Sequence, residues 1–351
     1  MNTLSLRENR QEAAQTDRLC HLIESHAPVL RSAGAGKRFK LEGVRFQLYC
    51  ADRNTVYRVK DGSEWFLKMP RSGNPAAVER EIIGAQAVRE TLTGSSGYQH
   101  PRVVRASTEH GYLLTARIKG TMLNRALYRS SYAPLPWLRR RIEEAFANLG
   151  RVLALLHGRH VQANVFMNRP VSSGLHGALE KVTRSDQVCE LIRRHFGQPV
   201  APIVEQGLSH GNLHLQNVIA AGRQVSIIDF ENCGRGSIYA DLSLVCAQLT
   251  YTTATVHVRS RRLAACKTAF LAGYREHRDY DPVVLNQATV ARVAHYYLDA
   301  FCGNKGRPTI GGIPVSRRRV RRLVETLLRA DGESAVNDIS TVAPPTTGCH
   351  A

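Results

Sequence analysis

One short hairpin signal constrains the fold of this 351-residue chain more than any other feature. The apolar strand Val218–Ala220 leads into the turn Ala221–Arg223, and a second apolar strand follows at Val225–Ile228. A turn with a glycine between two short apolar runs is typical of a β-hairpin. Such a hairpin brings Asn217, just before the first strand, close to Asp229, just after the second.

The residue types at these two ends predict a metal site. Carboxylate and amide oxygens are hard ligands, and Mg²⁺ binds through a few of them while keeping waters or phosphate oxygens. We therefore predict that Asn217 and Asp229 bind Mg²⁺. Neither residue alone would support this prediction. Their positions at the two ends of the hairpin, after the segment His210-Gly211-Asn212, do support it.

A lysine and an acid upstream of the hairpin suggest a phosphate site. Lys68 ends the apolar strand Trp65–Lys68, and the helix expected over 75–92 carries Glu79 and Glu81. Phosphoryl transfer from a nucleotide needs a lysine on the phosphates and an acid that orients it. We favour Glu81 as that acid because apolar residues follow it directly. Taken alone, Lys68 is more typical of a solvated strand end, and the glutamates are more typical of a polar helix face.

The order of the elements predicts an α+β fold with two lobes. Short strands are expected between 38 and 69 and between 103 and 117, whereas long helices dominate after Gly120. Further helices are expected near 136–157, 174–195, 240–250, 258–277, 283–302 and 315–330. We assign residues 1–36 to an N-terminal helical extension, 37–118 to a small antiparallel sheet lobe, 119–331 to a larger helical lobe, and 332–351 to a disordered tail.

The sequence resembles the aminoglycoside phosphotransferase and choline kinase group. Its hallmark is H-G-D-x-x-x-x-N followed by a strand that ends in I-D-[FW]-[ED]. Here those motifs read His210–Asn217 and Ile228–Glu231. Weaker matches, spread over residues 40 to 305, are Asn54–Val59, Phe66–Lys68, Leu114–Gly120, Leu153–His157, Tyr239–Leu242 and Phe270–Tyr274.

The resemblance implies a bilobal protein-kinase-like fold with ATP, or another nucleoside triphosphate, bound between the lobes. By position, Lys68 would hold the nucleotide phosphates and Glu81 would pair with it. Asn217 and Asp229 would bind Mg²⁺. His210 and Asp241 would brace the catalytic loop, and His157 and Tyr274 are expected to be packing residues.

The nucleotide loop departs from the family pattern. Glycines that let the backbone approach phosphate are common there, whereas this chain has Ala51-Asp52-Arg53-Asn54. We place Arg53 and Asn54 in the nucleotide site, where Arg53 would add positive charge near phosphate.

The second departure is Asn212, which stands where the family has the catalytic aspartate. An amide can accept a hydrogen bond but cannot take up a proton near pH 7. General-base assistance is worth about 10²- to 10⁴-fold, so its loss predicts a slow enzyme and not necessarily an inactive one. We keep Asn212 and His210 as the catalytic-loop residues, with Glu231 or His214 as alternative bases.

The formal net charge of +19 suggests an anionic partner. Many of the arginines lie at 317–322 on an expected amphipathic helix, and three more are Arg139–Arg141. They could be a solvated helix face, or they could contact an anionic membrane surface or an anionic or lipid-linked acceptor. Nucleic acid is not favoured, because no zinc-finger, RNA-binding or helix-turn-helix pattern accompanies the charge.

The remaining composition predicts a cytoplasmic protein. The eight cysteines are scattered and form no C-x-x-C pair, which is typical of reduced thiols. The first residues, Met1–Arg7, lack the continuous apolar stretch of a secretory signal, and nowhere do about 18 apolar residues run together, so we expect neither a secretory signal nor a transmembrane segment.

These observations predict an ATP- and Mg-dependent phosphotransferase that acts on a hydroxyl of a small molecule or sugar. A non-catalytic kinase-fold protein that binds nucleotide or a partner is the alternative. A basic nucleic-acid-associated protein is a weaker one.

Overall fold

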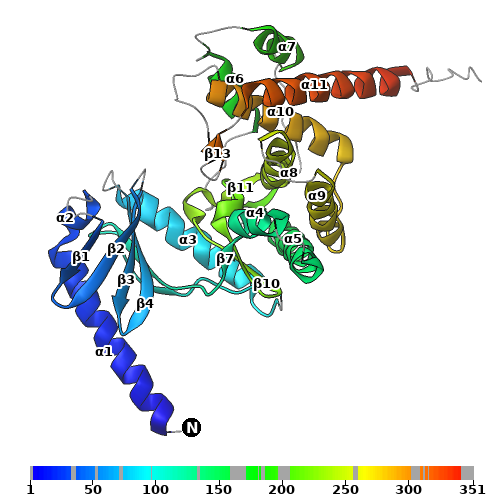
Figure 1. Ribbon diagram of the computed structural model, residues 1–351. Helices are drawn as coiled ribbons and strands as arrows, with labels where there is room; N and C mark the ends of the chain where they lie inside the picture. The colour runs from blue at the N-terminus through cyan, green and yellow to red at the C-terminus, as the bar shows by residue number, and fades with distance from the viewer. Residues whose placement is uncertain are drawn as a thin grey trace, which may run out of the picture.

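The computed structural model describes residues 3–32, 37–51, 54–70, 74–95, 97–132, 135–158, 171–180, 182, 186–196, 206–255, 260–301, 309–310, 313–314 and 316–340. A sheet-rich N-lobe and a larger helical C-lobe lie side by side (Figure 1). The helix α3 (Pro75–Leu92) lies between the N-lobe sheet and the C-lobe.

The N-lobe is built on a six-stranded antiparallel sheet in the order β1-β2-β3-β4-β6-β5. Its strands are β1 (Arg38–Leu41), β2 (Val44–Ala51), β3 (Asn54–Asp61), β4 (Ser63–Pro70), β5 (Val103–Ser107) and β6 (Tyr112–Ala116). Alternate residues of β3 and β4 are buried, which is the pattern of strands with one face on a core. The strands that the sequence predicts in 38–69 and 103–117 are therefore present.

Two N-terminal helices complete the core of this sheet. They are α1 (Thr3–Ser25) and α2 (Ala27–Arg31). Leu19 and Ile23 are fully buried in one cluster with Trp65. The Tyr57 hydroxyl donates a 3.0 Å hydrogen bond to the Leu30 carbonyl oxygen. The C-terminal part of the predicted helical extension therefore shares one core with the sheet.

The helix α3 fits tightly against the C-lobe because Gly84 has no side chain. A Cβ atom at Gly84 would lie 2.8 Å from the Phe230 carbonyl oxygen and 2.8 Å from the Cys233 Cβ. Asn74 caps the helix, its side chain accepting a 3.0 Å hydrogen bond from the Ala76 amide. The segment after Asp229 is thereby held against the helix that carries Glu81.

In its described residues, the C-lobe is helical around one three-stranded sheet and two strand pairs. Its helices are α4 (Leu123–Tyr132), α5 (Pro136–His157), α6 (Val171–Glu180), α7 (Gln187–Phe196), α8 (Ile238–Thr255), α9 (Ser260–Arg275), α10 (Pro282–Phe301) and α11 (Arg317–Ser340). Its strands are β7 (Thr121–Met122), β8 (Gln206–Ser209), β9 (Val218–Ala221), β10 (Gln224–Ile227), β11 (Gly234–Ser237), β12 (Thr309–Ile310) and β13 (Ile313–Pro314), and the 3₁₀ turns are η1 (Leu215–Asn217) and η2 (Phe230–Asn232).

Two glycines bring α5 and α9 into backbone contact. A Cβ atom at Gly150 would lie 2.0 Å from the Phe270 carbonyl oxygen, and one at Gly273 would lie 2.1 Å from the Ala147 carbonyl oxygen. The helix predicted over 136–157 is present as α5, with Phe146 and Leu153 fully buried. This packing forms the C-lobe core beneath the hairpin.

Some elements differ from the sequence expectation. The single helix expected near 174–195 is two helices, α6 and α7, and α4 was not expected. The helix α11 continues to Ser340, so residues 332–340 of the predicted disordered tail are helical. A helix that is already formed extends at little cost, because each added residue gains one hydrogen bond. Residues 341–351 lie outside the described residues.

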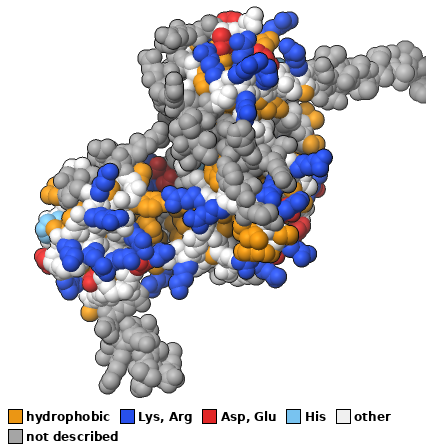
Figure 2. All heavy atoms as spheres, in the orientation of Figure 1, with side chains coloured by type: hydrophobic (Ala, Val, Ile, Leu, Met, Phe, Trp, Pro, Cys, Tyr) orange, Lys and Arg blue, Asp and Glu red, His pale blue; other side chains and the backbone are white. Residues whose placement is uncertain are grey.

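No helix in the described part of the chain is long and apolar enough to cross a membrane. Lysine and arginine side chains are spread over both lobes on the face drawn in Figure 2. On that face, acidic side chains lie in a recess between the lobes.

Candidate active site

The hairpin places Asn217 and Asp229 side by side. Strands β9 and β10 pair antiparallel, with Val218 opposite Ile227. The Ile228 amide donates a 2.9 Å hydrogen bond to the Asn217 carbonyl oxygen. The Asn217 Nδ2 atom lies 3.3 Å from Asp229 Oδ2. The two residues that the sequence places at the ends of one hairpin are therefore neighbours in space.

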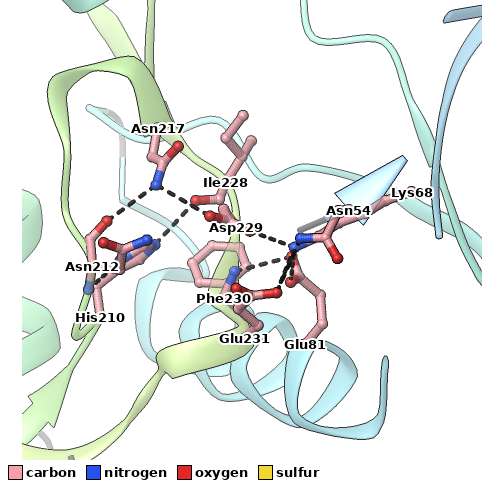
Figure 3. A network of polar contacts seen from close by, with 10 residues as sticks. All are labelled: Asn54, Lys68, Glu81, His210, Asn212, Asn217, Ile228, Asp229, Phe230 and Glu231. Atoms are coloured by element: carbon pink, nitrogen blue, oxygen red, sulfur yellow. Dashed lines mark hydrogen bonds and ion pairs between the residues drawn. The ribbon is translucent and has the colours of Figure 1, made fainter. Parts of the chain in front are cut away.

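Asp229 has a left-handed backbone, with φ 72° and ψ 61°. This conformation is uncommon for a residue with a side chain, and it is kept only where the surroundings stabilise it. Contacts from Asn217 and Lys68 hold the carboxylate on both sides. The turn directs the Asp229 side chain toward the N-lobe lysine (Figure 3).

The buried carboxylate of Asp241 braces the start of the loop. It accepts hydrogen bonds from the amides of His210 (2.7 Å) and Gly211 (3.0 Å), from the Ser209 hydroxyl (3.0 Å) and from His157 Nε2 (3.2 Å). Burial by itself raises the pKa of Asp241, but these donors and the nearby imidazoles outweigh it and lower the pKa. Asp241 is therefore an ionised structural group.

His210 ties the loop to the metal-site strand. Its Nδ1 atom accepts a 3.3 Å hydrogen bond from the Asn212 amide, so its Nε2 atom carries the proton and donates to the Ile228 carbonyl oxygen over 3.0 Å. The imidazole thereby bridges the main chain of Asn212 and the main chain of Ile228, which directly precedes Asp229. His210 positions the loop through its ring.

Lys68 reaches the same place from strand β4. Its Nζ atom lies 2.6 Å from Glu81 Oε2 and 3.3 Å from Glu231 Oε2, and it also contacts Asp229 Oδ1 (Figure 3). Of the two glutamates considered as partners, Glu81 is buried and makes this contact, whereas Glu79 is exposed. The Phe230 amide donates a 2.9 Å hydrogen bond to Glu81 Oε1, which links α3 to the segment after Asp229.

The Lys68 ammonium and the Asp229 carboxylate stabilise each other's charged forms, whereas burial and the Asp229 charge raise the pKa of Glu81. Burial lowers the pKa of Lys68, but the carboxylates of Glu81, Asp229 and Glu231 outweigh it, so the pKa lies above its usual value. Burial raises the pKa of Asp229, and the Lys68 ammonium overcomes this and lowers the pKa. The lysine therefore stays charged, and Asp229 is ionised at neutral pH.

The nucleotide-loop residues are only partly described. Asn54 begins β3, and its Nδ2 atom donates a 3.2 Å hydrogen bond to Glu231 Oε2. Asn54 is therefore part of the polar cluster at Lys68. Arg53 lies outside the described residues.

The main chain of Asn212 is held on both sides. Its amide donates to His210 Nδ1, and its carbonyl oxygen accepts from the His214 amide (2.8 Å) and from Asn217 Nδ2 (3.0 Å). The Asn212 side chain makes no hydrogen bond to the residues that the structure describes. The amide that replaces the expected carboxylate is therefore available to a ligand.

The oxygens at this site suit a hard divalent cation. Glu81, Asp229 and Glu231 each offer one carboxylate oxygen, and these oxygens lie within 4.8 Å of one another. The Asn217 amide nitrogen is held by the Asn212 carbonyl oxygen, which leaves the Asn217 amide oxygen as the atom that could bind a cation. This donor set fits Mg²⁺.

The sequence matches the model of the phosphotransferase enzyme family over residues 51–283. The chain belongs to this family. The matched segment contains the lysine strand, the catalytic loop and the metal-site hairpin. No curated protein matches the phosphotransferase by sequence.

Solved structures confirm the predicted bilobal kinase-like fold. Amicoumacin kinase, in complex with AMP-PNP, Ca²⁺ and Ami, is 17% identical with a TM-score of 0.56, covering 86% of this chain and 92% of that one. A choline/ethanolamine kinase family protein from Mesorhizobium loti is 14% identical with a TM-score of 0.51, covering 89% and 94%. The GDP complex of wild-type aminoglycoside 2'-phosphotransferase-IIIa is 15% identical with a TM-score of 0.51, covering 92% and 98%.

Sequence reasoning missed Gln248 of the phosphotransferase. From α8, its Oε1 atom accepts a 2.9 Å hydrogen bond from the Leu215 amide, and its Nε2 atom lies 3.0 Å from His214 Nδ1. Gln248 thus holds the loop from the C-lobe side. The available signal was one polar side chain in the otherwise apolar run Leu244–Leu249.

Proposed function

We propose that the protein transfers a phosphoryl group from ATP, with Mg²⁺, to a hydroxyl of a small molecule. The observation that carries the proposal is the contact of Lys68 with both Glu81 and Asp229, which brings the N-lobe lysine to the C-lobe metal site. Family membership supports phosphoryl transfer as the reaction class.

Two residues would serve the nucleotide phosphates, and two others would bind the metal ion. Lys68 would hold phosphate oxygens, and Glu81 would orient the ammonium, since its own second oxygen is fixed by the Phe230 amide. Asp229 and Asn217 would hold the metal ion through their oxygens. When bound, Mg²⁺ supplies positive charge that neutralises the phosphate oxygens. AMP-PNP and GDP occur with two of the structural neighbours, so ATP and GTP are both to be tested.

Asn212 would orient the acceptor hydroxyl and would not remove its proton. Positioning and charge stabilisation supply most of the acceleration in phosphoryl transfer, so transfer would continue at a reduced rate. His210 would act on the reaction only through the placement of Asn212.

Neither alternative base is suited to replace the missing carboxylate. Glu231 is bound to Lys68 and to Asn54, on the nucleotide side of the site. His214 Nδ1 accepts from Gln248, so its other nitrogen is protonated. Burial and the charge of Arg292 lower the pKa of His214 to about 4, which makes it a weak base.

The second candidate function is nucleotide binding without transfer, and the amide at position 212 favours it.

Thermal shift with Mg-ATP, followed by ADP release in an acceptor screen, separates the two functions. We expect Mg-ATP to raise the Tm of the wild type, and Asp229→Asn to abolish that rise. The exposed Asp279→Asn is the matched control. Nucleotide binding without ADP release for any acceptor would favour the second function, and no binding at all would contradict both.

A further inference from the structure

Arg292 of helix α10 carries a charge that nothing in the described structure neutralises. Its Nε atom is buried and lacks a hydrogen-bond partner. Among the described residues, its guanidinium forms no hydrogen bond and no ion pair, although part of the residue remains accessible. Arginine cannot lose its proton in a protein, and a partly buried guanidinium whose Nε atom has no partner has lost hydration there that no described residue replaces. A bound anion would supply a partner for this guanidinium.

The surroundings place Arg292 on the C-lobe side of the catalytic loop. Helices α10 and α8 pack together. Tyr296, one turn after Arg292, packs against Tyr251 of α8 with ring centroids 5.4 Å apart. Gln248 lies on α8 one turn before Tyr251, and it holds His214 and the Leu215 amide. Arg292 is near enough to His214 for its charge to help lower the pKa of that imidazole.

The one carboxylate whose charge reaches Arg292 is already saturated. Asp241 favours the charged form of Arg292, but its two oxygens are occupied by donors from His210, Gly211, Ser209 and His157. Burial dominates and lowers the pKa of Arg292 from its usual value. Asp241 therefore does not replace a direct partner.

Arg292 also lies apart from the nucleotide cluster. Lys68 contacts Asp229, Glu81 and Glu231 from the N-lobe, whereas Arg292 comes from α10. The family match ends at residue 283, before Arg292. Lys68 thus comes from the N-lobe strand β4, and Arg292 comes from the C-lobe helix α10.

We propose that Arg292 binds an oxyanion of the acceptor, either a carboxylate or a phosphate monoester. The guanidinium fork can bind either group through two parallel hydrogen bonds. The net charge of +19 would also attract an anionic small molecule to this lobe. The substrate class rests on the proposed phosphotransferase function, but the oxyanion site can be tested without turnover.

Methyl phosphate and acetate are suitable probes, because they carry the two groups without a sugar or nucleotide. Their Kd values are measured at constant ionic strength. ADP and Mg²⁺ are present to occupy the proposed nucleotide site at Lys68. Arg292→Gln is compared with wild type, and Arg318→Gln is the matched control because Arg318 is an exposed arginine on α11. The Tm of each variant checks folding, and Arg292→Lys tests whether a charge without the fork suffices.

We expect Arg292→Gln to weaken binding of at least one probe roughly 10- to 100-fold, as for loss of a charge-assisted hydrogen bond. Arg318→Gln should stay within about twofold of wild type, because surface charges act weakly. The probe that loses affinity identifies the oxyanion as carboxylate or phosphate. Equal affinities in wild type and Arg292→Gln, or no binding of either probe to wild type, would overturn the proposal. Failure of the phosphotransferase function would appear separately, as no ADP release with any acceptor.

Discussion

The Asn217 side chain donates a 3.0 Å hydrogen bond to the main-chain carbonyl oxygen of Asn212. Asn217, proposed to bind the metal ion, and Asn212, proposed to orient the acceptor, are therefore fixed to each other through the backbone of Asn212. The side chain at position 212 can change without loss of this bond. The amide thus alters the chemistry of the loop and leaves its geometry in place.

Asn212→Asp should accelerate phosphoryl transfer. A carboxylate in the same place could take the acceptor's proton, so we expect kcat to rise about 10- to 100-fold, within the range of general-base assistance. ADP release with an acceptor found by screening measures it. Asn212→Ala is the control that removes positioning as well, and it should be slower than wild type. An unchanged or lower kcat for Asn212→Asp would contradict the role given to Asn212.

His214 should remain neutral well below the usual pH range of histidine. Burial, followed by the charge of Arg292, lowers its pKa to about 4. The unfolded chain takes up this proton at higher pH, so stability is lost as pH falls from about 6.5 toward 4. The free energy of unfolding of the wild type should fall between pH 7 and pH 5, and His214→Gln should make this fall smaller by about 2 kcal/mol. Urea unfolding at the two pH values measures the difference. An NMR titration that shows His214 protonating near pH 6.5 would refute this prediction.

Asp186 should stabilise the outer helices of the C-lobe in a pH-dependent manner. Its carboxylate caps α7 through the amides of Val188 and Cys189, and it accepts from Tyr297 (2.5 Å) and Arg317 (3.0 Å). Burial raises its pKa, but these donors outweigh it and lower the pKa to about 2.

The contribution is therefore present above about pH 4 and is lost as pH falls toward 2. Asp186→Ala should cost about 1 to 2 kcal/mol at pH 7, and the difference from wild type should shrink between pH 5 and pH 3. Chemical unfolding at both pH values measures it, with the exposed Asp279→Ala as control. A difference that does not change with pH would mean that the Asp186 charge contributes nothing.

Arg292→Met should stabilise the ligand-free protein. Methionine keeps most of the apolar stem and removes a charge that has no partner in the described structure. We expect Tm to rise by about 1 to 2 °C, which corresponds to roughly 1 kcal/mol for a protein of this size. Arg318→Met at an exposed position should leave Tm almost unchanged. A fall in Tm for Arg292→Met would show that the guanidinium is already compensated.

The parts that sequence reasoning predicted well depend on short-range patterns. The hairpin needs only a turn between two apolar runs, and α5 needs only apolar residues at helical spacing. The same reasoning merged α6 and α7 into one helix, because periodicity alone did not locate the break between them. It also did not reveal that Leu19 and Ile23 pack in the core of the sheet.

The sequence by itself determined the family, the hairpin with Asn217 and Asp229, and the departure at Asn212, because these depend on residues close together in the chain. Only the tertiary structure decided which glutamate meets Lys68, and how Glu231, Gln248 and Arg292 are placed. The contact between Lys68 and Asp229 joins residues 161 positions apart. Such contacts are set by the packing of α3, α8 and α10 around the loop, and no local sequence pattern encodes them.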